Sequence, residues 1–200
     1  MLNRFRKRIL PLMAKTGVFF GSIEASPTVW SGVGFVVAIT SAIIYSISNA
    51  FGIDYQFKFT IVAGCMLLIS GFFDVVDGCV ARYTQKVSKR GAFIDSTLDK
   101  IAEFVILTGV TIGALSDPIM SILAICFSFM VSYVRARAES LHVDLRGIGI
   151  GERAERILIL AVASFIPISY SIQFGIFLII IISGITLIQR VYYVTRRLKD

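Results

Sequence analysis

The sequence predicts an all-α membrane protein with six transmembrane helices, preceded by an N-terminal amphipathic juxtamembrane helix. Three observations lead to this fold class. The chain of 200 residues is 56% hydrophobic, which is more apolar than a typical soluble domain, and its mean hydropathy is +0.81. Apolar stretches of roughly 20 residues, the length that a helix needs to cross a bilayer, recur along it. The basic residues gather between these stretches.

The N-terminal element is basic and amphipathic. Phe5, Ile9 and Leu12 recur at helical spacing among lysines and arginines, which is typical of a helix that lies along the membrane surface. We therefore expect an interfacial helix over residues 1–20 and a six-helix bundle over residues 28–196, which together form one domain. The six predicted spans are residues 28–50, 57–82, 91–114, 117–140, 153–171 and 174–196.

The basic residues predict the orientation in the membrane. All of the 20 lysines and arginines except Lys58 and Lys100 belong to the N-terminal arm, to the segments that follow the second and fourth spans, or to the C-terminal end. Six spans place these four groups on one side, which the positive-inside rule assigns to the cytoplasm. We expect a multi-pass protein of the cell membrane with both termini in the cytoplasm. Since topology and contact with anionic phosphate explain the net charge of +7, no nucleic-acid partner is expected.

Acidic residues inside the predicted spans are the most informative feature. Asp74 and Asp77 are three residues apart near the end of the second span, and Asp95 and Asp99 are four apart near the start of the third. Each pair therefore projects from one helix face. A short loop joins these spans, so we expect antiparallel neighbours whose carboxylates converge near the cytoplasmic surface. Carboxylates in a membrane need compensation, which the hard cations Mg²⁺ and Mn²⁺ provide best.

Residues beside these acids suit a diphosphate ligand. Gly78 and Ala81 are small on the same side of the helix, which lets a bulky ligand approach the backbone, and Arg82 follows one step further. Arginine binds phosphate in a bidentate manner, and divalent metal stabilises the charge of phosphoryl groups. Two alternatives remain at this point: a proton or cation relay in a transporter, and acids that only lie at the membrane interface.

The same residues carry a family resemblance. From Asp74 to Asp99 the chain matches D-x-x-D-G-x-x-A-R, then eight residues, then G-x-x-x-D-x-x-x-D without a gap. This string resembles the signature of the CDP-alcohol phosphotransferases. The resemblance implies a metal-dependent membrane enzyme, usually a homodimer, that transfers the phospho-lipid group of a CDP-linked lipid to an alcohol and releases CMP.

The resemblance also implies roles for single residues. Asp74, Asp77 and Asp95 would bind metal, as a pair of Mg²⁺ or Mn²⁺ ions, and Asp99 would be a catalytic base within the metal cluster; a purely metal-binding Asp99 is the alternative. Residues 26–31 are similar to the family's T-P-x-x-x-T stretch, which touches the nucleotide, with serine in place of both threonines. The residues expected to bind the CDP-lipid are Thr28, Val29, Trp30, Ser31, Asp74, Gly78, Ala81, Arg82 and Ser88.

Three arginines narrow the choice of acceptor. Arg135, Arg153 and Arg190 belong to different spans and can surround one phosphate group, which an acceptor such as serine would not need. The stretches R-A-R-A-E, E-R-A-E-R and Q-R that contain them resemble those of phosphatidylinositol-phosphate and archaetidylinositol-phosphate synthases, with Arg135 replacing a lysine. The resemblance implies binding of 1L-myo-inositol 1-phosphate. Glycerol 3-phosphate remains an alternative acceptor, and anchoring of helix ends an alternative role.

Two further expectations concern the lipid and a loop. The sequence leaves the tails of the CDP-lipid open between diacylglycerol and archaeol. The glycine-rich residues 147–151 follow a membrane helix, whereas a dinucleotide-binding loop follows a strand. We therefore expect a flexible loop over the acceptor pocket.

Overall fold

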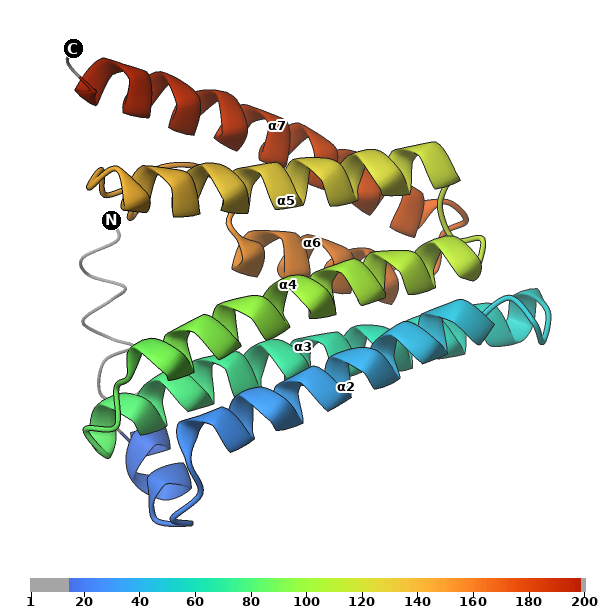
Figure 1. Ribbon diagram of the computed structural model, residues 1–200. Helices are drawn as coiled ribbons and strands as arrows, with labels where there is room; N and C mark the ends of the chain where they lie inside the picture. The colour runs from blue at the N-terminus through green and yellow to red at the C-terminus, as the bar shows by residue number, and fades with distance from the viewer. Residues whose placement is uncertain (1–14, 199–200) are drawn as a thin grey trace.

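The computed structural model describes residues 15–198, and the regular structure in this range is entirely helical (Figure 1). A short helix over residues 15–21 precedes six further helices. Their bounds are Pro27–Ile47 (α2), Ile53–Tyr83 (α3), Lys89–Ile112 (α4), Pro118–Ser140 (α5), Arg153–Phe165 (α6) and Ser171–Arg197 (α7). The predicted interfacial helix falls mostly on residues 1–14, outside the described range.

Local residue choice explains where helices begin. Pro27 and Pro118 lie in the first turns of α2 and α5, where the missing N–H has no helical partner to lose. The carboxylate of Asp117 caps α5 by accepting hydrogen bonds from the N–H groups of Ile119 (2.9 Å) and Met120 (3.2 Å). The predicted spans agree with α2 to α5 and with α7 to within a few residues.

Helix α6 is shorter than the predicted span over residues 153–171. It ends at Phe165 after 13 residues and is therefore about 20 Å long, whereas the hydrocarbon layer is about 30 Å thick. Pro167 accounts for this end, because proline disfavours a helical backbone in the residue before it. Ile166 is accordingly extended, with φ −90° and ψ 117°. The prediction of a long helix here was wrong.

Four of the described helices are long and apolar enough to cross a membrane: α2, most of α3, α5 and α7. Helix α4 opens with Lys89 and Arg90 and carries further charges along its first half, and α6 is too short. The helix composition is thus that of a multi-pass membrane protein, and the number of crossings stays a prediction.

Helix α2 organises the first half of the bundle, because it packs along both α3 and α4 (Figure 1). Close approach to α4 depends on small residues. A Cβ atom on Gly109 or Gly113 would overlap the carbonyl oxygen of Ala42 or Tyr45, respectively. In the second half, α5 packs on α7, and α6 packs on α3 and α7.

Helices α3 and α4 do not pack as predicted. They are not among the pairs of described helices in extensive contact, although only a short loop joins them. Both pack on α2 instead, and the acidic side chains near their polar ends line one narrow cavity. The helical hairpin was expected from the loop length, but the third helix decides how closely its arms approach.

Candidate active site

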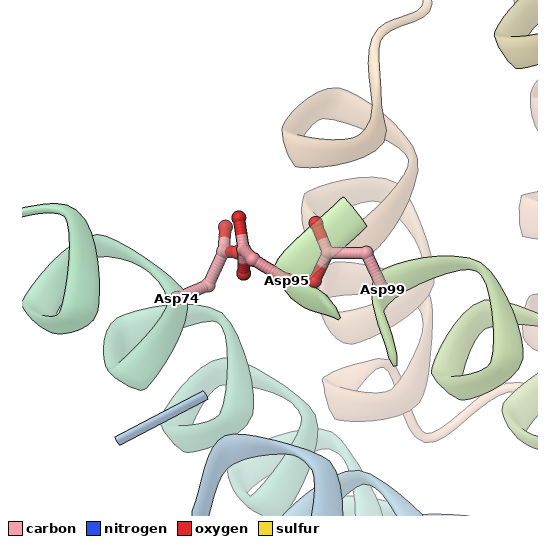
Figure 2. A group of neighbouring side chains, drawn as sticks. All are labelled: Asp74, Asp95 and Asp99. Atoms are coloured by element: carbon pink, nitrogen blue, oxygen red, sulfur yellow. The ribbon is translucent and has the colours of Figure 1, made fainter. Parts of the chain in front are cut away.

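Three aspartates from two helices meet at the polar end of the bundle. Asp74 of α3 faces Asp95 and Asp99 of α4 (Figure 2). Each offers a carboxylate oxygen, and these oxygens all lie within 4.8 Å of one another. We call Asp74, Asp95 and Asp99 the acid group. Oxygen ligands at this spacing fit a hard divalent cation.

The fourth predicted ligand, Asp77, lies beside this group. It is buried, and the hydroxyl of Ser31 in α2 donates a hydrogen bond of 2.5 Å to its Oδ2. Asp77 lines the same narrow cavity as the three aspartates of the acid group. The structure thus brings three of the four predicted acids into one set and orients the fourth from α2.

A cavity of about 270 Å³ opens on one side of the acid group. We call it the donor cavity, and Asp77 and Asp95 form its inner wall. Ser88, which was expected to touch the CDP-lipid, caps α4 by accepting a hydrogen bond from the N–H of Gly91 (3.0 Å). The predicted lipid-binding residues that line the donor cavity are Thr28, Ser31, Gly78, Ala81, Arg82 and Ser88.

Three predicted lipid-binding residues do not line the donor cavity, and one of them, Asp74, belongs to the acid group. Val29 is 51% exposed, and the ring of Trp30 stacks on Phe73 with centroids 5.9 Å apart. Neither lines the donor cavity. Thr28 and Ser31 are three residues apart and share one helix face, whereas Trp30 packs on α3 beside that face and Val29 is exposed. The structure therefore gives no contact between these two side chains and the site.

A larger cavity of about 690 Å³ lies on the other side of the acid group. We call it the acceptor cavity. All three predicted phosphate-binding arginines line it, and they come from different helices: Arg135 from α5, Arg153 from α6 and Arg190 from α7. Asp95 and Asp99 form part of its wall. Asp95 borders the donor cavity as well, so the acid group stands between the two hollows.

Each of these arginines has a partner in the protein. Arg153 Nη1 contacts Oδ1 of Asp74 at 2.9 Å and Oδ1 of Asp99 at 2.5 Å. Arg135 pairs with Glu139 at 3.0 Å, and this pair is half exposed. A phosphate group would therefore compete with carboxylates for both guanidinium groups.

Arg190 is held more firmly. Its three nitrogens donate to the carbonyl oxygens of Ile148 (2.9 Å) and Val131 (3.0 Å) and to Oε1 of Glu152 (3.0 Å). The residue is 2% exposed. It joins α5, α7 and the loop before α6, in addition to lining the acceptor cavity.

The loop over residues 147–152 is fastened on several sides. The hydroxyl oxygen of Thr186 accepts hydrogen bonds from the N–H groups of Ile150 (3.1 Å) and Gly151 (2.8 Å). Gly147 and Gly149 take positive φ angles, +76° and +115°, which favour glycine. The glycines thus serve a hydrogen-bonded turn, and the flexibility of this loop stays a prediction.

Three charged residues beside the site were missed from the sequence. Glu103 of α4 accepts hydrogen bonds from Lys100 (2.7 Å) and from Arg156 of α6 (2.6 and 3.0 Å). Lys100 and Arg156 also line the acceptor cavity. A signal was present, because Glu103 lies four residues after Asp99 and continues its helix face.

The chemistry of this arrangement is that of a group transfer between two polar ligands. One hollow is lined by small residues, hydroxyls and Arg82, and the other by several arginines. Carboxylates that can hold divalent metal separate them. Such a centre suits a diphosphate on one side and an anionic acceptor on the other.

Comparisons with protein families and with curated proteins agree with this chemistry. The family model described as CDP-alcohol phosphatidyltransferase matches residues 26–195. The archaetidylinositol phosphate synthase of Pyrococcus horikoshii is 35% identical over 199 residues, which cover 100% of this chain and 99% of that protein.

Solved structures share the fold. The phosphatidylinositol phosphate synthase of Mycobacterium tuberculosis with CDP-DAG bound superposes with a TM-score of 0.77 at 21% identity, covering 92% of this chain and 94% of that one. The same enzyme in complex with manganese and citrate gives a TM-score of 0.75 at 22% identity, covering 92% and 88%.

Proposed function

This chain belongs to the CDP-alcohol phosphatidyltransferase family, and from this premise we propose that it transfers the lipid phosphate group of a CDP-linked lipid to inositol 1-phosphate. The products are the lipid inositol phosphate and CMP. The observation that carries the choice of acceptor is the acceptor cavity, into which α5, α6 and α7 each bring an arginine next to the acid group. An acceptor that is already a phosphate ester needs such a set of cations.

The donor cavity suits the CDP part of the lipid. Arg82 presents a guanidinium group to a diphosphate, while Thr28, Ser31 and Ser88 offer hydroxyls to polar parts of the nucleotide. Gly78 leaves room beside Arg82, whose guanidinium atoms would lie 3.6 to 4.0 Å from a Cβ atom there. The lipid tails, diacylglycerol or archaeol, would remain in the bilayer.

The carboxylates suit a divalent metal. Asp74, Asp95 and Asp99 present oxygens to one another, and Asp77 is oriented toward the same space by Ser31. We assign Mg²⁺ or Mn²⁺ to this set, as a pair of ions. When bound, the metal would supply Lewis-acid stabilisation of the charge on the diphosphate oxygens.

We assign the role of general base to Asp99. It lines both the narrow cavity of the acid group and the acceptor cavity. Its carboxylate takes the proton from the acceptor hydroxyl, whose oxygen forms a new bond to the β-phosphorus while the bond from that phosphorus to CMP breaks. Arg135, Arg153 and Arg190 hold the acceptor phosphate, and Arg153 exchanges its aspartate partners for phosphate oxygens when it does so.

We further propose one membrane domain over residues 1–200 with six crossings, both termini in the cytoplasm and a homodimeric assembly. Helix α6 and residues 166–170 together would make the fifth crossing. The segments after α3 and α5 and the C-terminal end of α7 lie at the same end of the bundle (Figure 1). These are basic parts of the chain, which supports a single cytoplasmic side with the site beside it.

An acceptor panel tests the function. Purified full-length protein receives CDP-archaeol or CDP-diacylglycerol with Mg²⁺, and CMP release is measured with inositol 1-phosphate, glycerol 3-phosphate, inositol or serine. Among these acceptors, we expect only inositol 1-phosphate to cause release of CMP, and we expect EDTA to abolish that release. Release with glycerol 3-phosphate alone would overturn the acceptor assignment, and release with unphosphorylated alcohols would overturn the role of the arginines.

A further inference from the structure

A second ionic contact joins α4 to α6 one turn beyond the acid group, and the proposed reaction does not use it. Arg156 donates from Nε and Nη2 to the two carboxylate oxygens of Glu103, at 2.6 and 3.0 Å. This is a bidentate pair. Both side chains are buried, with 3% and 8% of their surface exposed. A buried ion pair adds little stability relative to well-packed apolar residues, so a specific placement is the better reason for this one.

The third nitrogen of Arg156 reaches the loop before α6. Nη1 donates to the carbonyl oxygen of Gly151 at 2.5 Å, and the N–H of Gly151 donates to Thr186 at 2.8 Å. All three nitrogens of this guanidinium are therefore hydrogen-bonded within the protein. Arg156 borders the acceptor cavity, but each of its nitrogens already has a partner in the protein, so we assign it the holding of the cavity wall.

The contact of Arg156 with Glu103 also affects the position of Arg153, because both arginines lie on one face of α6. Asp99 and Glu103 are four residues apart on α4, and Arg153 and Arg156 are three apart on α6, so each pair lies on one helix face. Asp99 meets Arg153 and Glu103 meets Arg156. Helix α4 packs mainly on α2 and α5, and α6 packs mainly on α3 and α7. These side-chain contacts therefore set where α6 begins relative to α4.

We infer that Glu103 and Arg156 are positioning residues for acceptor recognition. Their pair fixes the first turn of α6 so that the Arg153 guanidinium faces the acid group and the acceptor cavity. Neither residue needs to touch a reacting atom. The inference rests on the proposed function, because it requires an acceptor whose phosphate Arg153 binds.

A double variant separates positioning from stability. Glu103→Leu combined with Arg156→Met replaces the pair by apolar side chains of similar size, which proteins often tolerate without loss of stability. We expect a thermal midpoint close to that of the wild type and a KM for inositol 1-phosphate raised on the order of tenfold to a hundredfold, as for a misplaced binding group. The half-saturating concentration of CDP-lipid should change less than about twofold, because the donor cavity lies across the acid group.

A second variant and a control keep the test decisive. Arg156→Lys keeps the charge but loses the planar guanidinium group, so it should raise the acceptor KM by a smaller factor than the double variant. If the double variant does not fold, the acceptor KM of Arg156→Lys tests the inference. Asp144→Asn breaks an exposed ion pair with Arg146 in the segment between α5 and α6 and should leave all kinetic constants unchanged.

Two results would overturn the inference. One is a folded variant with the wild-type acceptor KM. The other is an equal rise in the half-saturating concentrations of acceptor and CDP-lipid, which would indicate general loosening of the bundle. Failure of the proposed function is distinguishable, since the wild type would then release no CMP with inositol 1-phosphate.

Discussion

Two ionic contacts connect α4 to α6, one turn apart, and their surroundings differ. Asp99 and Arg153 are partly accessible, with 23% and 15% of their side chains exposed, and both line the narrow cavity and the acceptor cavity. Glu103 and Arg156 are buried, and Arg156 has a partner for each of its nitrogens. We call them the open pair and the closed pair.

The two pairs carry the same charges, but their arginines differ in how many hydrogen bonds they make. In the open pair, Nε and Nη1 of Arg153 are buried without a hydrogen bond of good geometry, although Nη1 touches two carboxylates. Such a group can exchange partners with a ligand at little cost, because few bonds have to be broken. In the closed pair, removing Glu103 leaves the buried charge of Arg156 uncompensated, whereas removing Arg156 leaves Glu103 with Lys100 as its partner. On the proposed function, the open pair is therefore the contact that exchanges partners during the transfer.

Substituting the carboxylate residue of each pair should give the largest effects, on activity for the open pair and on stability for the closed pair. Asp99→Asn removes the proposed base, so CMP release should fall by about 10²–10⁴-fold while the thermal midpoint changes little. Glu103→Gln leaves Arg156 buried and unpaired, which should cost roughly 3–5 kcal/mol of stability. Steady-state CMP release and the thermal midpoint of both purified variants measure the contrast.

The contrast fails in two recognisable ways. If Asp99→Asn retains turnover near that of the wild type, the assignment of Asp99 as the base is wrong. If Glu103→Gln melts at the temperature of the wild type, water or the amide oxygen of the glutamine compensates the buried guanidinium, and the closed pair does not fix α6.

A smaller effect is expected when the cation of the open pair is removed. Arg153→Gln leaves three carboxylates close together with less positive charge nearby, so a metal should bind more tightly. We expect the apparent dissociation constant for Mn²⁺ to fall by about tenfold, which corresponds to about 1.4 kcal/mol. The acceptor KM should rise in the same variant. Titration of the free protein with Mn²⁺, followed by electron paramagnetic resonance, measures the affinity without turnover.

Arg135→Gln is the matched control for this titration. Arg135 lines the same cavity but pairs with Glu139 and with none of the aspartates. Its removal should leave the Mn²⁺ affinity unchanged. Equal affinities of the wild type and Arg153→Gln would show that the guanidinium does not compete with metal.

Sequence spacing was sufficient for the features that lie along one helix. The apolar stretches predicted five helices to within a few residues, and the intervals between Asp74, Asp77, Asp95 and Asp99 placed each pair on one face. The sequence also contained a signal for the end of α6, because Pro167 follows it. The predicted helix was nevertheless extended past the proline, since apolar residues continue beyond it.

Contacts between helices could not be read in this way. Spacing places Glu103 on the same face as Asp99, but it does not show that α6 lies opposite with Arg156 at matching height. The separation of α3 from α4 likewise depends on how α2 packs against both. Periodicity orients a residue about its own helix axis, whereas its partner is decided by packing of segments distant in the chain.

The glycine loop offers the smallest test, and it probes how the closed pair is supported. Gly149→Ala introduces a Cβ atom 2.4 Å from Cγ2 of Thr186, at a φ of +115°. Gly147→Ala has a φ of +76° and open space around its Cβ, so it carries the backbone strain alone. Strain of this kind costs about 1–3 kcal/mol. Both variants should be less stable than the wild type, and Gly149→Ala more so.

The two glycine variants should differ most in the acceptor KM. Thr186 must move to admit the new methyl group, and its hydroxyl holds the N–H of Gly151, whose carbonyl oxygen is bound by Arg156. Gly149→Ala should therefore raise the KM for inositol 1-phosphate a few-fold, less than loss of the closed pair, while Gly147→Ala leaves it unchanged. Equal KM values would mean that the backbone conformation alone holds the loop. The start of α6 would then depend on Glu103 and Arg156 without help from Thr186.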